Sequence, residues 1–396
     1  MLVAGIRDFH RRKKQVSGSK PVAEKDLPTF SVVVPAKNEE VVLPRLLNAL
    51  LSQNYPKEKF EVIVVEDGST DGTLDVCKSF VKDLRTQIKI VRGEDSNGKP
   101  SALNRALGVS RGDIVAIFDA DNIPEPDTLA NAAMHFQDGS IVALQGRTLT
   151  VNSDANMLTK FVSYEEAAWF EGYMRGKDCL DLFVHLKGSC QFIRRRTLES
   201  IGRWSEKHLS EDLEMSARLV KKGLRIRYAS DVRSWQECPE TLAKMFRQRI
   251  RWYRGAMEVA LNYGRLVRRP SWKILDAEIT LFGPFILIAS LLSYVISPLI
   301  LGSLSGTILL AVTLAGWISL TASLVVGALA LVYVAKPKRK RDVLWLPFIY
   351  AYWSFQVVLA CWALMKIVFR VPKEWKKTSK TGTVTAANTL SQGSDS

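Results

Sequence analysis

Three long apolar segments in the last third of the chain restrict its fold more than any other feature. They cover residues 279–301, 308–335 and 343–369, and they contain almost no charged side chain. Each is longer than the roughly 20 residues that an α-helix needs to cross a bilayer. Buried core helices are the alternative, but three in succession would need a further layer of protein to cover them. The sequence therefore predicts a membrane region over residues 276–370, behind a soluble part.

Basic residues around these segments predict how the chain crosses the membrane. Arginines are frequent over residues 247–268, so the positive-inside rule places this side in the cytosol. The 302–307 loop has no Lys or Arg and should face outward, and the basic run 336–341 should return inward. A full third crossing would place the basic residues 370–380 outside, against the rule. Pro347 and the aromatic residues of the third segment also allow an interfacial or re-entrant course, so both courses stay open.

The positive charge and its distribution along the chain indicate which binding partners to expect. The formal net charge of +15 would by itself suit nucleic acid. The basic runs, however, lie at the N-terminus or beside the apolar segments, at residues 11–14, 336–341 and 373–380. In such places each Lys or Arg favours anionic headgroups by about 1 kcal/mol. The sequence also has no basic groove interleaved with aromatic residues, so membrane lipids are the expected partner and nucleic acid is not.

The cysteines and the N-terminal residues indicate where in the cell the protein is expected. The five cysteines have no C-x-x-C pair, and with four dispersed histidines they offer no zinc-site spacing. The soluble part is therefore expected in the reducing cytosol, attached to a multi-pass region in the cell membrane. Residues 1–28 are expected to form a basic membrane-surface segment followed by a linker.

Strands alternate with helices before residue 275. Continuous apolar runs, typical of strands buried on both faces, occur at residues 30–35, 60–65, 88–91 and 113–118. Helical periodicity follows these runs at residues 41–51, 72–84, 100–107 and 128–136. This alternation predicts an α/β fold with a Rossmann-like, mostly parallel sheet. Ligands of such sheets bind beyond the carboxyl ends of the strands.

Acidic residues stand at two of these strand ends. Glu66 and Asp67 follow the second run, and Asp119 and Asp121 follow the fourth. Carboxylates two residues apart repel each other unless a cation such as Mg²⁺ or Mn²⁺ bridges them to a pyrophosphate. The alternative is an ordinary acidic turn with a helix cap. Their place at the strand ends favours a nucleotide and metal site.

Two later segments carry further candidates. Residues 210–214 begin a helix, where the serine and acids suit either a helix cap or a general base at Asp212. Gln248, Arg251 and Trp252 share one face of another helix. Arginine can neutralise a leaving diphosphate, and tryptophan can stack on a sugar ring. The alternative is a basic interfacial helix with snorkelling arginines.

The order and spacing of these segments resemble the family 2 glycosyltransferases. The matching segments are Val65 to Ser69, Asp119-Ala120-Asp121, Gly188-Ser189-Cys190, Ser210-Glu211-Asp212 and Gln248 to Trp252. The resemblance is strongest to the membrane-bound processive branch, which includes cellulose, chitin, hyaluronan and poly-N-acetylglucosamine synthases. It covers residues 29–260, and Trp375 to Thr378 is similar to the branch's W-x-K-T element. It implies a GT-A fold and inverting transfer from a UDP-sugar.

The resemblance also implies roles for particular residues. It assigns the nucleotide-sugar pocket to Pro35, Asn38, Glu39, Asp67, Lys99 and Asp119. Asp121 matches the metal ligand, for Mg²⁺ or Mn²⁺, and Asp212 matches the general base. The acceptor and diphosphate side is assigned to Gln248, Arg251 and Trp252. Ser210 replaces the usual threonine of the base motif and keeps its hydroxyl.

These assignments predict the domains and leave two acceptors open. The expected order is a GT-A catalytic domain at 29–235, interfacial helices at 236–275, the membrane region, and a basic then disordered tail at 371–396. The expected activity is extension of a growing glycan at the cytosolic membrane face. The alternative is transfer of one sugar to a lipid, either polyprenyl phosphate or a glycolipid, because the two N-terminal spans of the branch have no counterpart here. A homo-oligomer or a partner membrane subunit would be needed for a wide channel.

Overall fold

The computed structural model describes most of the soluble part and the last apolar segment. The described residues are 4–5, 24–81, 88–93, 98–264, 271–290, 346–373 and 380–382, with isolated residues between 311 and 325. The predicted segment 308–335 and the end of 279–301 fall almost entirely outside these residues, as do most of 1–28 and of the tail. The multi-pass topology therefore stays a prediction.

The first half of the sheet is parallel, as predicted. Its strands are β1 (Phe30–Ala36), β2 (Phe60–Glu66), β3 (Ile88–Arg92) and β4 (Ile114–Ile117), in the order β3-β2-β1-β4. The helices between and after them are α2 (Leu43–Leu51), α3 (Thr73–Val81), α4 (Lys99–Val109) and α5 (Thr128–His135). β1 and β2 carry an unbroken run of apolar side chains because helices cover both faces of the sheet. One face packs on α2 and α5 and the other on α4.

The second half of the sheet adds antiparallel pairs to the predicted parallel ones. The eight strands run β3-β2-β1-β4-β7-β6-β8-β5, with β6 at Ile141–Thr150, β7 at Gln191–Arg194, β8 at Arg225–Gln236 and β5 at Ile123–Pro124. β7 pairs antiparallel with both β4 and β6, and β5 pairs antiparallel with β8, whereas β6 pairs parallel with β8. Of the seven strand pairs in the described residues four are parallel, so the sheet is mixed but mostly parallel. Polar residues break the apolar residues of β6 and β8 into short stretches, so these strands lack the long apolar run that marks β1 and β2.

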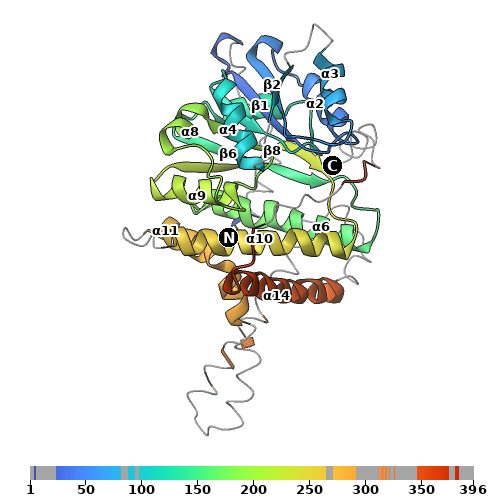
Figure 1. Ribbon diagram of the computed structural model, residues 1–396. Coiled ribbons are helices and arrows are strands. Elements are labelled where there is room, and N and C mark those ends of the chain that lie inside the picture. Colours follow the sequence, from blue (N-terminus) through green and yellow to red (C-terminus); the bar gives the residue numbers. More distant parts are fainter. Residues whose placement is uncertain are drawn as a thin grey trace.

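Helices beneath the sheet carry the later motifs. They are α6 (Met157–Ala167), a π-helical turn η3 (Ala168–Met174), α7 (Arg175–Cys179), α8 (Arg195–Ile201), α9 (Glu211–Lys221), α10 (Leu242–Tyr263) and α11 (Trp272–Leu281). α10 runs across the base of the sheet domain, and α14 (Leu346–Val368) lies alongside it on the side away from the sheet (Figure 1). The Tyr253 hydroxyl donates to Gln356 at 3.2 Å, and the Phe246 and Phe355 rings stack 5.2 Å apart. The third apolar segment thus packs against the domain.

α14 has one buried and one exposed apolar face. Tyr352, Leu359 and Ala363 are buried against the domain. Phe348, Val358, Trp362, Met365 and Val368 are exposed, and Phe355 is half exposed beside Phe246. Among the described residues, the stretch Ala351–Val368 is the one helix long and apolar enough to cross a membrane. Whether this segment crosses the membrane or lies at its interface stays a prediction.

Candidate active site

A cavity of about 460 Å³ lies at the carboxyl ends of the central strands. It is bounded by the residues after β1, β2 and β4, by the start of α9 and by one face of α10. Of the predicted site residues it is lined by Pro35, Glu39, Asp67, Lys99, Asp119, Asp121, Asp212, Gln248, Arg251 and Trp252. The structure therefore brings together residues that the sequence separates by more than 200 positions.

Asn38 is the predicted site residue that does not line this cavity. Its backbone is left-handed, with φ of 55°. Its N–H donates to the Ser69 hydroxyl at 3.0 Å, and its side-chain carbonyl accepts from the Thr70 N–H at 2.8 Å. Asn38 thus supports the loop after β2, and its predicted contact with the nucleotide stays a prediction.

Lys99 neutralises the acidic wall of the cavity. Its ammonium donates to Asp119 at 2.6 Å and to the Gly188 carbonyl at 2.8 Å, and it lies 3.7 Å from Glu211. Burial opposes the charge of Lys99, but Asp119, Glu211 and Asp212 outweigh it and raise the pKa of this lysine. Lys99 therefore stays protonated.

Gly188 permits this close arrangement. Its φ is +83°, and a Cβ there would lie 3.3 Å from both the Asp212 carboxylate and the Lys99 ammonium. The turn before β7 that contains Gly188 and Ser189 is therefore part of the cavity wall. Ser189 contributes as well, because its hydroxyl accepts from the Asp119 N–H at 2.9 Å.

Asp212 has the electrostatics of a base that works near neutral pH. Burial, and next the Glu211 carboxylate, raise its pKa from the usual 3.8 to about 7. The Leu213 N–H donates to Asp212 at 2.8 Å and, with the Lys99 charge, limits the shift. Burial therefore outweighs the positive helix end, which would alone hold the pKa of this carboxyl low. Of the capping alternative, the serine cap is absent, since the Ser210 side chain makes no cap hydrogen bond to α9, whereas the acids of the first turn and the basic residues of the last turn are present.

Close packing holds the α10 face over this base. A Cβ on Gly255 of α10 would meet the Ser210 hydroxyl at 2.2 Å, so glycine lets the helix approach the start of α9. One helical turn earlier, Arg251 and Trp252 line the cavity. Arg249 is held by Glu165 at 2.5 Å and lies 4.6 Å from the Trp252 ring centroid.

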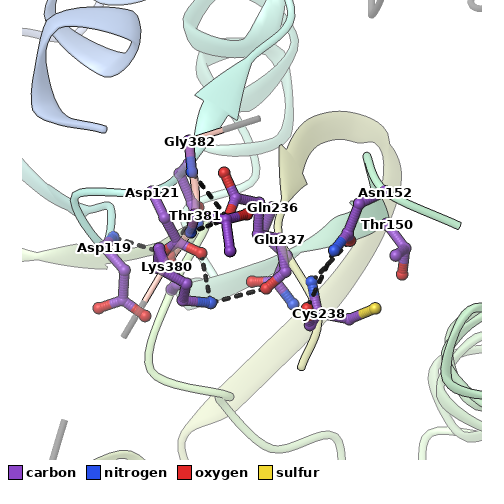
Figure 2. Close-up of polar contacts among 12 residues, drawn as sticks. Asp119, Asp121, Thr150, Asn152, Gln236, Glu237, Cys238, Lys380, Thr381 and Gly382 are labelled. Atoms are coloured by element: carbon purple, nitrogen blue, oxygen red, sulfur yellow. Dashed lines mark hydrogen bonds and ion pairs between the residues drawn. The ribbon is translucent and has the colours of Figure 1, made fainter. Parts of the chain in front are cut away.

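Asp121, the predicted metal ligand, forms an ion pair with Lys380 at 2.6 Å (Figure 2). The Lys380 ammonium also donates to the Glu237 carbonyl at 2.6 Å. The Glu237 carboxylate accepts from the Thr381 N–H at 3.0 Å and from Arg45 at 2.6 Å. A short piece of the tail thus places a positive charge where a cation is expected.

The carboxylates present fit a metal that also uses ligands from the substrate. Among the described residues no group of three or more His, Cys, Asp or Glu could hold a metal ion by itself. Mg²⁺ is commonly held by one or two carboxylates together with substrate phosphates. Asp121, with 6% of its surface exposed, and Asp119 both line the cavity and suit that arrangement.

Sequence reasoning missed several residues of the cavity wall. They are Glu165, Glu166, Trp169, His185, Lys187, Glu237 and Lys380. Most lie in segments without a motif signature, and Lys380 was assigned with its basic run to membrane headgroups. Its actual partner, Asp121, lies more than half the chain away, and no pattern in the sequence links the two.

Comparison with known proteins identifies the family. The model of the glycosyltransferase-like family 2 matches residues 28–255, more than half of the chain. The protein therefore belongs to this family and is a glycosyltransferase. The chain is 35% identical to a probable glycosyltransferase, YdaM, of Bacillus subtilis over 60% of its own length and 58% of the relative's. It is 30% identical to the β-monoglucosyldiacylglycerol synthase of a Nostoc species over 68% of its own length and 58% of the relative's.

A solved structure supports the GT-A-like fold. The mannosyltransferase PcManGT of Pyrobaculum calidifontis, determined with GDP-Man and Mn²⁺, superposes with a TM-score of 0.57 and 22% identity, over 93% of this chain and 96% of that one. At this identity the match establishes the fold alone. The chain spans less than two thirds of the curated relatives named above, so their activities apply to those proteins.

Proposed function

We propose that this protein transfers a sugar with inversion from a UDP-sugar to an acceptor hydroxyl at a membrane face. The observation that carries the proposal is the position of Asp212, with a pKa raised to about 7, between the Lys99–Asp119 pair and the α10 face. A general base is most effective when its pKa lies near the working pH. Asp212 takes the hydroxyl proton as the acceptor oxygen attacks the anomeric carbon and the bond to UDP breaks.

The leaving diphosphate is stabilised by cations already in the wall. Lys99 remains charged beside Asp119, and Arg251 lies within electrostatic reach of Glu211, Asp212 and Asp119. Preorganised positive groups aimed at developing charge give a large share of catalysis in sites shielded from water. Asp121, with Asp119, would hold a Mg²⁺ or Mn²⁺ ion that supplies Lewis-acid stabilisation of the diphosphate. The expected nucleotide contacts remain Pro35, Glu39 and Asp67.

Metal binding then requires the Lys380 ammonium to leave Asp121. Lys380→Met is expected to tighten Mn²⁺ binding by about fivefold or more, since it leaves the largely buried Asp121 carboxylate without its counter-ion. Titration of Mn²⁺ by electron paramagnetic resonance, in the presence of UDP, measures this directly. Lys373→Met is the matched control, because Lys373 belongs to the same end of the chain but pairs with Glu258 at 2.8 Å. Unchanged or weaker Mn²⁺ binding by the Lys380 variant would contradict the competition.

The acceptor is proposed to be presented from a membrane. α14 turns an apolar face outward, and α11 begins at Trp272, whose surface is 81% exposed. Trp is enriched at membrane interfaces. Extension of a growing glycan remains the first candidate. Transfer to a lipid is the second, favoured by the identity to a glucosyldiacylglycerol synthase.

The proposed function is tested by UDP release. Purified protein in vesicles with Mn²⁺ is offered UDP-glucose, UDP-N-acetylglucosamine, UDP-galactose and UDP-glucuronate, each with oligosaccharide or lipid acceptors. One donor is expected to give acceptor-dependent UDP release, and product length separates a polymer from a single transfer. No release above the blank with any donor would refute the proposed function.

A further inference from the structure

Lys187 is a charged residue of the cavity that the reaction described above does not use. Its backbone is fixed on both sides, because its N–H donates to Gln145 at 2.7 Å and the Leu186 N–H donates to the Ser216 hydroxyl at 2.9 Å. The next residue, Gly188, donates to Gln191 at 3.1 Å. The Lys187 side chain lines the cavity. Its direction is therefore set by the folded wall.

Lys187 lies on the side of the cavity that is assigned to the acceptor. The charges that act on it include Arg249 and Glu165 as well as Asp212. Arg249 belongs to α10, pairs with Glu165 and lies 4.6 Å from the Trp252 ring centroid. Trp252 is one of the residues assigned to the acceptor, and Lys187 lines the same cavity.

The Lys187 ammonium meets aromatic rings in place of oxygen atoms. It lies 4.6 Å from the Phe170 ring centroid and 5.8 Å from that of Trp169. Within the described part of the chain it has neither a hydrogen bond nor a carboxylate within 4.0 Å. Burial lowers the pKa of Lys187, which reflects this shortage of partners. Three N–H donors are therefore available to a bound group.

The nearby carboxylates are already occupied. Glu165 accepts from Arg249 at 2.5 Å and from the Tyr352 hydroxyl of α14 at 2.8 Å. Glu166 accepts from the Thr150 hydroxyl at 2.8 Å and from Gln236 at 3.2 Å. Neither can turn to Lys187 without losing these contacts.

Two more polar atoms on this wall lack partners among the described residues. They are the buried Trp169 Nε1 and His185 Nδ1. Burial, followed by the charges of Lys177 and Lys187, lowers the pKa of His185 to about 3, so its ring is neutral. Besides the paired carboxylates Glu165 and Glu166 and the Arg249 guanidinium, this wall therefore holds neutral polar and aromatic groups around the Lys187 ammonium.

We propose that Lys187 binds a phosphate group carried by the acceptor next to its reacting hydroxyl, so that the acceptor is an anionic phospholipid. The inference rests on the proposed function and favours the second of its two acceptors, a lipid, over a growing glycan. A phosphate suits a half-buried ammonium without a counter-ion, because charge-assisted hydrogen bonds to phosphate are about twice as strong as neutral ones. Tyr352 brings the membrane-facing helix α14 to the same wall, which suits an acceptor with acyl chains. The hydroxyl is the nucleophile and loses its proton to Asp212, and the phosphate stays bound unchanged.

Direct binding tests the inference without turnover. Glycerol 1-phosphate, glycerol and inorganic phosphate are titrated calorimetrically into protein saturated with UDP and Mn²⁺. Glycerol 1-phosphate is expected to bind most tightly, at least tenfold more weakly to Lys187→Met, and within threefold of wild type to Lys187→Arg. Lys160→Met is the control, because Lys160 also lies over an aromatic ring, at 5.9 Å from Tyr164, and does not line the cavity. Equal binding of glycerol 1-phosphate by wild type and Lys187→Met overturns the inference, and so does inorganic phosphate binding as tightly as glycerol 1-phosphate.

Kinetics separates this inference from the proposed function. UDP release is measured with phosphatidylcholine vesicles containing either phosphatidylglycerol or diacylglycerol. Lys187→Met is expected to raise the KM for phosphatidylglycerol at least tenfold while shifting the KM for the UDP-sugar less than threefold. Wild-type preference for diacylglycerol overturns the Lys187 assignment and leaves the glycosyltransferase proposal standing. Thermal unfolding of each variant verifies that the fold is intact.

Discussion

Asp212→Asn is expected to lower sugar transfer by roughly 10²–10⁴-fold, the usual contribution of a general base. The amide has nearly the same shape but cannot accept the proton of the acceptor hydroxyl. UDP binding should stay within a few-fold of wild type, because the nucleotide contacts lie on the strand ends. Single-turnover transfer and calorimetric UDP binding measure the two effects separately. Asp75→Asn is the control, since Asp75 is an exposed carboxylate of α3 whose side chain is 84% exposed.

The raised pKa of Asp212 also predicts how kcat/KM depends on pH. The general base must be ionised, so the kcat/KM of the wild type should rise with pH and level off above the pKa of about 7. Glu211 contributes to the raised value, and Glu211→Gln should therefore move this limb to lower pH. A rate independent of pH from 5 to 8, or an Asp212→Asn variant with near wild-type turnover, would refute the assignment of the base.

The sequence predicted strands best where their side chains are buried on both faces of the sheet. β1, β2 and β4 are covered on both faces, so their apolar runs predict strands within a residue or two of their ends. β6 and β8 escaped prediction because polar residues break their apolar residues into short stretches. The antiparallel position of β7 was also not predictable, since it depends on long-range pairing with β4 and β6.

The residues of the site likewise differ in whether the sequence could predict them. Asp67, Asp119 and Asp121 follow predicted strands, and their convergence follows from sheet geometry. The raised pKa of Asp212 could not be predicted from local rules, because it results from burial beneath elements distant in sequence. Lys187 and Lys380 belong to no motif. Each is identified as a site residue only by what its ammonium group contacts. Lys187 lies over an aromatic ring, and Lys380 pairs with Asp121.

Asp121→Asn is expected to lower metal-dependent transfer roughly 10²-fold or more, the usual loss when one preorganised electrostatic contact to a leaving group is removed. Mn²⁺ binding in the presence of UDP should weaken in parallel, which electron paramagnetic resonance detects without turnover. Asp231→Asn is the control, because that carboxylate pairs with His135, 2.9 Å away, and does not line the cavity.

A double variant shows whether Asp121 and Lys380 act on one cation position. Lys380→Met tightens Mn²⁺ binding only by removing a competitor from Asp121, so the same change should have little effect once Asp121 is asparagine. Interaction energies of this kind are expected for residues in contact and vanish for independent sites. Additive effects of the two substitutions would mean that Lys380 and the metal occupy different places. Strong non-additivity would place the metal at the carboxylate that the tail lysine contacts in this structure.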